Sequence, residues 1–256
     1  MTNSSLAENF NQYFEIVFAA SSDLKREGYQ IRHQVYAEEL GWEPISGDGL
    51  EMDEYDNYAY SLLLKHKRTG AYAGTVRLII PPPDAPGNKL PFENHFVDSL
   101  LPDIKSPCDY DRGAFGEVSR LAVPEDFRRR AGEKKQPFIV NELSGDGAFS
   151  EEERRNFPNI AIGLYLSIIS FAKMCNHETM FVVVEPRLKK RLERVGLFFE
   201  QIGEEQDYHG IRALFCLPRE NFESKFNVEM LELYQSLEEQ LVKQIKLHPY
   251  LVQGES

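Results

Sequence analysis

The sequence has few residues of the kinds that mark secreted, metal-binding or membrane-spanning proteins. Its three cysteines, Cys108, Cys175 and Cys216, are odd in number and have no short ligand spacing, which argues against a disulfide framework and a zinc ribbon. The longest uncharged apolar run, 160–172, is shorter than the roughly 20 residues that cross a bilayer, so no transmembrane segment is expected. The N-terminus lacks a basic region leading into an apolar one, so we expect no secretory signal, and the cysteine pattern favours a reducing cytoplasm.

Basic charge is scarce as well. The 256 residues include 29 Lys and Arg against 41 Asp and Glu, giving a net charge of -12, and this balance excludes a generally basic nucleic-acid binder. Two short windows, 128–135 and 187–194, each carry +4, which leaves -20 for the rest of the chain. Such windows are either candidate docking sites for an anionic partner or phosphate, or solvated surface segments.

Several motifs that define hydrolases and nucleotide-binding proteins are missing. The chain has no G-x-S-x-G, no G-x-x-x-x-G-K-[ST], no G-x-G-x-x-G after a strand and no H-E-x-x-H. The pair His177-Glu178 lacks the second histidine, and the six histidines are scattered. Triad hydrolysis and metal-dependent hydrolysis therefore lose support, and no cofactor is expected.

What the sequence does contain is an alternation of strand and helix patterns. The patterns predict strands over 13–19, 58–67, 71–80, 115–123, 180–184, 198–202 and 211–217. They predict helices over 23–40, 159–176, 186–195 and 227–247, the last with an apolar stripe at helical spacing that packs on the domain or on a partner. Ser21 and Ser22 can cap the first of these helices.

The order of these elements predicts an α/β fold with a mixed central sheet and helices on both faces. We interpret residues 1–256 as a single domain whose core spans 13–217. Seven of the 14 prolines fall within 81–107, which predicts a long irregular loop over 81–114 without a helix. Because this loop carries Phe92 and Phe96, a functional loop is favoured over a solvated linker. A second loop is predicted over 127–158.

Two polar residues share one face of a predicted strand. Glu117 and Ser119 are two positions apart, so both side chains point to the same face, with Val118 and Arg120 on the other. A buried carboxyl has a raised pKa, which suits a general base. The alternative is a structural glutamate that is ion-paired with Arg77 or Arg120.

The order of several short segments resembles a known family. The segments are 31–36 (IRHQVY), 39–42 (ELGW), Asp53 and Asp56, 74–78 (GTVRL) and 117–121 (EVSRL). Together they resemble the autoinducer-synthase branch of the GNAT acyltransferases. The 182–184 strand with Val195-Gly196-Leu197-Phe198 is similar to GNAT proteins in general. The segments 90–93, 119–123 and 127–130 look closest to the acyltransferases associated with exosortase systems and to long-chain N-acyl amino acid synthases.

The resemblance implies roles for individual residues, several of which look unremarkable alone. By default Trp42 is a packing residue and 51–56 a solvated acidic loop. The implied catalytic residues are Glu117 as general base, Ser119 and Arg120. The implied substrate-pocket residues are Arg32, Tyr36, Trp42, Asp53, Asp56, Arg77 and Phe92. The implied donor-binding residues are Leu121, Ala122 and Val123, whose N–H groups would stabilise an oxyanion, and Arg128, Arg129 and Arg130. The helix from Ile160 and Phe96 would help to line an acyl channel.

The implied reaction is transfer of a fatty acyl group from a thioester to the amine of an amino acid or amino-acid derivative. The pyrophosphate-binding turn of acetyl-CoA-dependent relatives is altered here, with Lys134 in place of a small residue, which favours an acyl carrier protein over coenzyme A. Leu192 stands where many GNAT proteins have a tyrosine that protonates the leaving thiolate. The alternatives are an acetyl-CoA-dependent N-acetyltransferase, an S-adenosylmethionine-dependent lactone synthase and a non-catalytic acyl-binding module.

Overall fold

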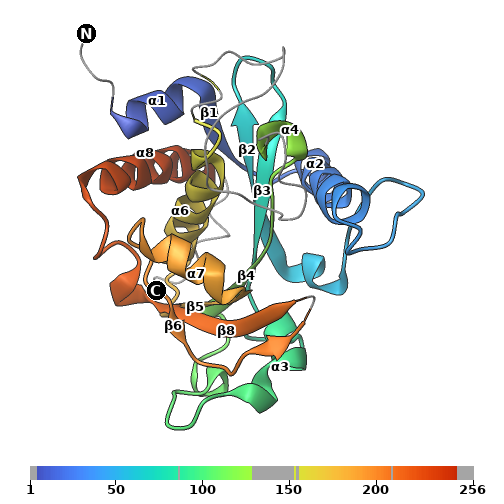
Figure 1. Cartoon of the computed structure of the whole chain (residues 1–256), viewed down its shortest axis with the longest axis vertical. Helices are drawn as coiled ribbons and strands as arrows, with labels where there is room; N and C mark the ends of the chain where they lie inside the picture. The colour runs from blue at the N-terminus through green and yellow to red at the C-terminus, as the bar shows by residue number, and fades with distance from the viewer. Residues whose placement is uncertain (1–4, 86, 129–152, 154–155, 209, 247–256) are drawn as a thin grey trace.

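An eight-stranded mixed sheet forms the centre of the molecule (Figure 1). The computed structural model describes residues 5–85, 87–128, 153, 156–208 and 210–246. The strand order is β1-β2-β3-β4-β5-β8-β6, with β7 paired to β8, and only β4 and β5 are parallel to each other. The strands are β1 (Phe14–Phe18), β2 (Ala59–His66), β3 (Tyr72–Ile79), β4 (Phe115–Ala122), β5 (Thr179–Val184), β6 (Glu200–Gln201), β7 (Gln206–Asp207) and β8 (Ile211–Pro218).

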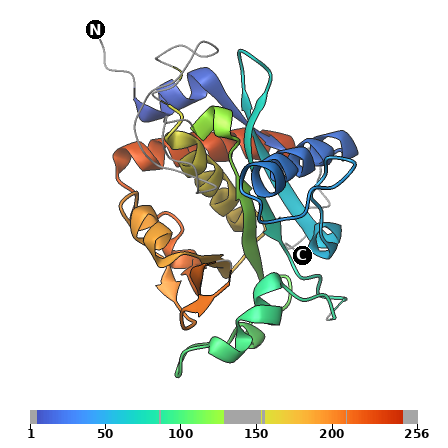
Figure 2. The same cartoon turned by 45° about the vertical axis from the view of Figure 1, so that its right-hand side comes forward.

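Helices cover both faces of the sheet, as predicted for the α/β class (Figure 2). One face packs against α6 (Asn159–Met174), which α8 (Val228–Ile245) and α1 (Leu6–Tyr13) flank. The other face packs against α2 (Ser22–Arg32) and its π-helical continuation, η1 (His33–Glu39). The main core lies between the sheet and α6, whose side chains from Ile160 to Ala172 are buried all round. None of the described helices is long and apolar enough to cross a membrane.

The strand and helix patterns located most elements correctly. Ser21 caps α2 by accepting a hydrogen bond from the backbone N–H of Leu24, as expected. The predicted strand at 180–184 is β5, an apolar segment between β4 and β8 in the sheet. The C-terminal amphipathic helix is α8, and its apolar stripe packs on this domain, against α6 and β1. Helix α1 was not predicted, although Ser5 and Glu8 form a capping box at its start.

The prediction of a helix-free loop over 81–114 was wrong. A short helix, α3 (Pro91–His95), lies within it, because proline is suited to the first helical position, where its missing N–H costs nothing. The Glu93 carboxylate accepts the orphan N–H of Leu90 at 2.6 Å. Phe92 and Phe96 are buried in a second apolar cluster with Phe181 of β5. The 81–114 segment is therefore anchored to the sheet.

The second predicted loop, 127–158, lies mostly outside the described residues. Its first two residues belong to a short helix, α4 (Glu125–Arg128), which corrects the predicted start of the loop. Near the C-terminus, β6 pairs with β8, with Glu200 opposite Cys216. β7 also pairs with β8, with Gln206 opposite Arg212. The remaining short helix on this side, α7 (Pro186–Glu193), follows β5 directly.

Side chains of α8 pair with the outer edge of β1. The backbone N–H of Ile16 donates to Oε1 of Gln240 at 3.1 Å, and that of Phe18 donates to Oε1 of Gln244 at 2.8 Å. Gln244 Nε2 donates in turn to the carbonyl of Ile16 at 2.8 Å. Backbone groups at the end of the sheet thus have hydrogen-bond partners, as buried or half-buried polar groups require.

Candidate active site

Because of a bulge in β4, two adjacent side chains point into the same pocket. Thr75 pairs with Ala122 and Arg77 with Ser119, so three steps along β4 lie opposite two along β3. Arg120 lies within the bulge, and its backbone is in the left-handed region, with a φ of 52°. Both Ser119 and Arg120 therefore line the pocket. The expectation that Arg120 lies on the opposite face from Ser119 was wrong, because strict alternation fails at a bulge.

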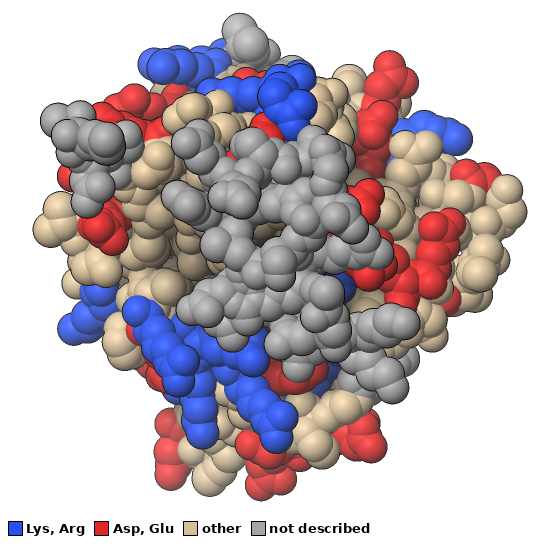
Figure 3. All heavy atoms as spheres, turned by 45° about the horizontal axis from the view of Figure 1, so that its top comes forward, with Lys and Arg blue, Asp and Glu red and all other residues tan. Residues whose placement is uncertain are grey.

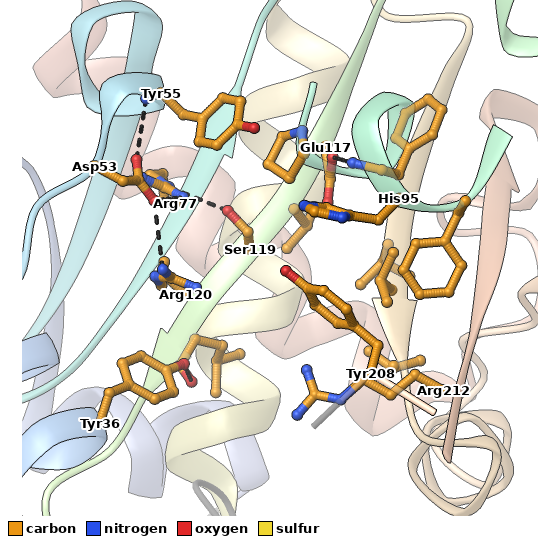
Figure 4. Close-up of a pocket in the computed structure, with 18 of the residues that line it drawn as sticks. Tyr36, Asp53, Tyr55, Arg77, His95, Glu117, Ser119, Arg120, Tyr208 and Arg212 are labelled. Atoms are coloured by element: carbon orange, nitrogen blue, oxygen red, sulfur yellow. Dashed lines mark hydrogen bonds and ion pairs between the residues drawn. The ribbon is translucent and has the colours of Figure 1, made fainter. Parts of the chain in front are cut away.

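The pocket lies where β4 and β5 stop pairing. Their last paired residues are Val118 and Val182, beyond which β4 continues into the bulge and β5 runs to Val184. The cavity between them has a volume of about 200 Å³ and is lined by both strands. Tyr36 and Arg120 lie on one side and Tyr208 and Arg212 on the other (Figure 4). An extended substrate can therefore enter between the two strands.

Glu117 lies in the middle of β4 and is only 3% exposed. Its Oε2 accepts the backbone N–H of Phe92 at 2.9 Å, which holds the carboxyl toward the pocket (Figure 4). Burial raises its pKa to about 8, against the opposing effects of the Phe92 hydrogen bond and of Arg77. Among the described residues, no ion pair joins Glu117 to Arg77 or Arg120. The alternative of a structural glutamate that is ion-paired with one of these arginines therefore loses support. A carboxyl with this pKa can exchange protons near neutral pH.

Three arginines and four carboxylates form a charged network beside the pocket. Arg77 donates to both oxygens of Asp53, at 2.6 and 2.9 Å, and to Asp56 at 2.8 Å. Arg32 donates to both oxygens of Asp56, at 2.7 and 3.0 Å, and also pairs with Glu51. Arg120 pairs with Glu51 at 3.0 Å and with Glu43 at 3.1 Å.

The network is held by partly buried charge pairs. Burial opposes ionisation of Asp56, yet its hydrogen bonds to Arg32 lower its pKa to about 2. Burial likewise lowers the pKa of Arg32, but its hydrogen bonds to Asp56 and Glu51 raise the net value above the ordinary one. Arg32 and Asp56 are fixed behind the pocket wall, whereas Asp53, Arg77 and Arg120 line the pocket. The guanidinium groups of Arg32 and Arg77 are engaged by protein carboxylates and not left open for a substrate.

Two aromatic residues shape the end of the pocket beside Arg120. Tyr36, on η1, donates its hydroxyl to the carbonyl of Leu121 at 2.7 Å. Trp42 stacks on Tyr36, with ring centroids 6.1 Å apart and an angle of 25° between the planes. Arg120 lies over Tyr36 at 5.6 Å and Arg212 over Trp42 at 5.4 Å from the ring centroids. Trp42 thus belongs to the pocket lining.

The predicted donor-binding residues are only partly brought together. Leu121 lines the pocket, whereas Ala122 and Val123 are buried outside its lining. Arg128 pairs with Glu39, the last residue of η1, and Arg129 and Arg130 lie outside the described residues. Phe92 does line the pocket, and its ring contacts that of Phe181 at a centroid distance of 4.9 Å. The roles proposed for these residues remain predictions.

The second basic window forms helix α7, which begins directly after the pocket-lining Glu185. Arg187, Lys190 and Arg194 are exposed there, and Lys189 pairs with Glu193 at 2.6 Å. Figure 3 shows a group of Lys and Arg side chains gathered on one face of the molecule. Basic charge thus lies next to the end of β5.

Several pocket residues were not predicted from the sequence. Tyr165 reaches the pocket from α6, Tyr55 from η2 (Glu54–Tyr58) and His95 from α3. In the charged network, Glu43 and Glu51 had not been assigned a role, although Glu51 belongs to the acidic run 51–56. No described group of three His, Cys, Asp or Glu side chains is arranged to hold a metal ion.

Comparisons with known proteins bear on the family and the fold of the chain. Residues 31–135 match the family described as Acetyltransferase (GNAT) domain. Comparison with curated protein sequences gives no match. Among solved structures, the AHL synthase LasI superimposes with a TM-score of 0.55 at 18% identity, over 84% of this chain and 98% of that one.

Two further structures have different described activities. BjaI, a CoA-dependent acyl-homoserine lactone synthase bound to SAM and isopentyl-CoA, gives a TM-score of 0.55 at 16% identity, covering 89% of each chain. FeeM, an N-acyl amino acid synthase from uncultured soil microbes, gives 0.51 at 13% identity, covering 85% of this chain and 97% of that one.

Together the comparisons establish the fold of the chain and a partial match to one family. The mixed sheet that opens between β4 and β5 is the fold shared with these solved structures, and residues 31–135 are similar to the Acetyltransferase (GNAT) domain. The predicted resemblance to autoinducer-synthase-like acyltransferases is confirmed at the level of the fold.

Proposed function

We propose that this protein transfers a fatty acyl group from a thioester on an acyl carrier protein to the amino group of an amino acid. The observation that carries the proposal is Glu117, a buried carboxyl with a pKa of about 8, held in a pocket at the opening between two parallel strands. Aminolysis of a thioester needs a base that can take a proton from an amine near neutral pH. The N-acyl amino acid synthases associated with exosortase systems are the group that we favour.

The reaction requires three groups to meet in the pocket. The neutral amine attacks the thioester carbonyl, forming a C–N bond while the C–S bond breaks. Glu117, directly or through a water, accepts the amine proton, and that proton balances the one that the released thiolate takes up. The N–H of Leu121, beside the bulge, is our candidate for stabilising the oxyanion. The thioester is the co-substrate, and no further cofactor enters this scheme.

The apolar side of the pocket suits an acyl chain. Phe92, Phe96, Val182 and Tyr165 line it, and the first two are anchored by the second apolar cluster. Burying methylene groups against such side chains gains about 0.8 kcal/mol per CH₂. A longer chain should therefore bind more tightly until the cavity is filled.

Helix α7 supports an acyl carrier protein as donor. Its exposed Arg187, Lys190 and Arg194 follow the pocket-lining end of β5, where a thioester arm would enter. A negatively charged carrier would be steered toward them, whereas coenzyme A offers fewer charges over a smaller area. The cytoplasm, with its reduced thiols, is the compartment that we propose.

One experiment separates the candidate functions. The protein is incubated with long-chain acyl carrier protein, the twenty amino acids and S-adenosylmethionine, and the product mass is read. An N-acyl amino acid supports the proposal. An acyl lactone with released methylthioadenosine indicates a lactone synthase, and acetylated product from acetyl-CoA alone indicates an acetyltransferase. A protein that binds acyl donor and yields no product is a binding module.

The donor is tested separately with charge reversal on α7. Arg187→Glu combined with Lys190→Glu should raise the KM for acyl carrier protein and leave the KM for a short pantetheine thioester unchanged. Equal effects on the two donors would remove the docking assignment.

A further inference from the structure

Arg212 differs from the other arginines of the pocket in its partners. It lies near the start of β8, lines the pocket and is half-buried. Arg77 and Arg120, which also line the pocket, each bind at least two carboxylates. Arg212 pairs with no carboxylate among the described residues, and its buried Nε has no hydrogen-bond partner there. A buried N–H without a partner is costly, so this group is suited to a ligand that supplies an acceptor.

Trp42 holds the guanidinium in place without using its N–H groups. The Cζ of Arg212 lies 5.4 Å from the centroid of the Trp42 ring. A stacked guanidinium keeps its planar fork of donors free at the edge, where two parallel N–H groups match a carboxylate. Figure 4 shows Arg212 and Tyr208 on the side of the pocket that faces Tyr36.

The opposite wall of the pocket disfavours an anion. Glu43 and Asp53 line it and are 32% and 21% exposed, so that wall presents carboxylates to the cavity. The arginines on that side already bind these carboxylates. A substrate carboxylate is therefore repelled from the network and attracted to β8, since like charges in a partly buried site cost energy.

We infer that Arg212 binds the α-carboxylate of the amino-acid acceptor and so selects amino acids over amines that lack a carboxylate. This inference rests on the proposed function, because it assigns one end of the acceptor in that reaction. With the carboxylate on β8, the amine is left to face Glu117 on β4. Arg212 is thus a specificity-determining residue, and Glu117 performs the chemistry.

The test compares acceptors with and without the carboxylate. Wild type, Arg212→Met, Arg212→Lys and Arg26→Met are each supplied with acyl carrier protein loaded with a 16-carbon chain. The acceptors are an equimolar mixture of amino acids or the matched mixture of their carboxamides. Arg26 is exposed on α2, outside the pocket lining, so its replacement controls for loss of one positive charge. Melting temperatures of all variants control for folding.

The expected result is a change in the ratio of the KM values for the amino-acid and carboxamide mixtures. Arg212→Met should raise the KM for amino acids roughly 10- to 100-fold, as expected for loss of a hydrogen-bonded ion pair, and change the KM for carboxamides less than twofold. Arg212→Lys should recover part of the preference, because it keeps the charge and loses the fork. Arg26→Met should behave as wild type.

Three outcomes overturn the inference. An equal loss with both mixtures indicates a structural role for Arg212, and a raised KM for the donor alone assigns it to the thioester. A wild type that prefers carboxamides also contradicts it. If wild type forms no N-acyl product with either mixture, the proposed function fails instead. Thermal shifts on adding amino acids or carboxamides then still test Arg212, because they require binding and no turnover.

Discussion

The backbone N–H of Phe92 donates a 2.9 Å hydrogen bond to the carboxyl of Glu117, joining α3 to the centre of β4. The bond links a proline-rich segment to the residue that we propose as the base. Because the donor is a main-chain group, its position depends on how α3 packs on the sheet. The burial of the Phe92 ring against Phe181 fixes that packing.

The first prediction concerns the pH dependence of acyl transfer. Glu117 must be deprotonated to accept a proton, so kcat/KM should rise with pH and level off above the pKa of about 8. Glu117→Gln should lower kcat by roughly 10²- to 10⁴-fold. Rates measured from pH 6 to 9.5 with a saturating acyl donor test both statements. Wild-type activity in Glu117→Gln would remove Glu117 as base.

The second prediction concerns the stability cost of the same group. The pKa of Glu117 is raised from 4.5 to about 8 in the folded state, so the folded protein binds the proton more tightly than the unfolded chain. Stability from this group is complete below pH 4.5 and is lost as pH rises toward 8, at up to about 1.4 kcal/mol per pH unit. The melting temperature of Glu117→Gln should therefore exceed that of wild type by a difference that grows as pH rises between these limits. A constant difference in melting temperature would contradict the buried, shifted carboxyl.

The third prediction concerns the charged network. Arg77 is 1% exposed, so Arg77→Met leaves Asp53 and Asp56 without one of their partners and should cost about 3–5 kcal/mol in urea unfolding. Lys65→Met on β2 is the control, since its 3.5 Å pair with Glu15 is exposed and contributes at most about 1 kcal/mol. Adding Asp53→Asn to Arg77→Met should recover part of the loss. Equal costs for Arg77→Met and Lys65→Met would show that the network is not a stabilising unit.

The fourth prediction concerns a buried histidine outside the pocket. His177 is fully buried, neither ring nitrogen has a hydrogen-bond partner among the described residues, and burial lowers its pKa to about 4. The unfolded chain takes up a proton near pH 6.5 and the folded one does not, so stability is lost as pH falls from 6.5 to 4. His177→Leu should lose less stability than wild type between pH 7 and 5. An equal loss of stability in both proteins between pH 7 and 5 would refute the assignment of His177 as a buried, neutral histidine.

The two titrations act in opposite directions between pH 4.5 and 6.5. Rising pH removes the stability contributed by protonated Glu117 and restores that contributed by neutral His177. The wild-type protein should therefore show a flatter stability profile in this range than either single variant. The comparison needs both variants measured in the same buffers.

Local patterns in the sequence located the strands and the faces that they bury. The alternation of side chains along a strand places Glu117 and Ser119 on one face, and this prediction holds because both residues precede the bulge. It failed for Arg120, because the extra residue in β4 depends on its pairing with β3, and no local pattern records that pairing. The single-turn α3 was missed for a similar reason, since its stability comes from packing on β5.

The pocket and network residues that escaped prediction lie where distant segments meet. Arg212 on β8 reaches Trp42, which follows η1 near the start of the chain. Glu51 contacts Arg32 and Arg120 from a loop with no regular pattern of its own. The family resemblance supplied Asp53, Asp56 and Arg77 as site residues, and the structure adds that they bind one another.

The glutamine contacts of α8 have a consequence for handling the protein. β1 is the outermost strand of the sheet, and an uncovered outer strand is a template for pairing with another chain. Gln240 and Gln244 occupy the backbone groups that such pairing would use. Truncation before α8 should therefore favour intermolecular β-sheet formation and aggregation, and fusion partners are better attached without cutting into this helix.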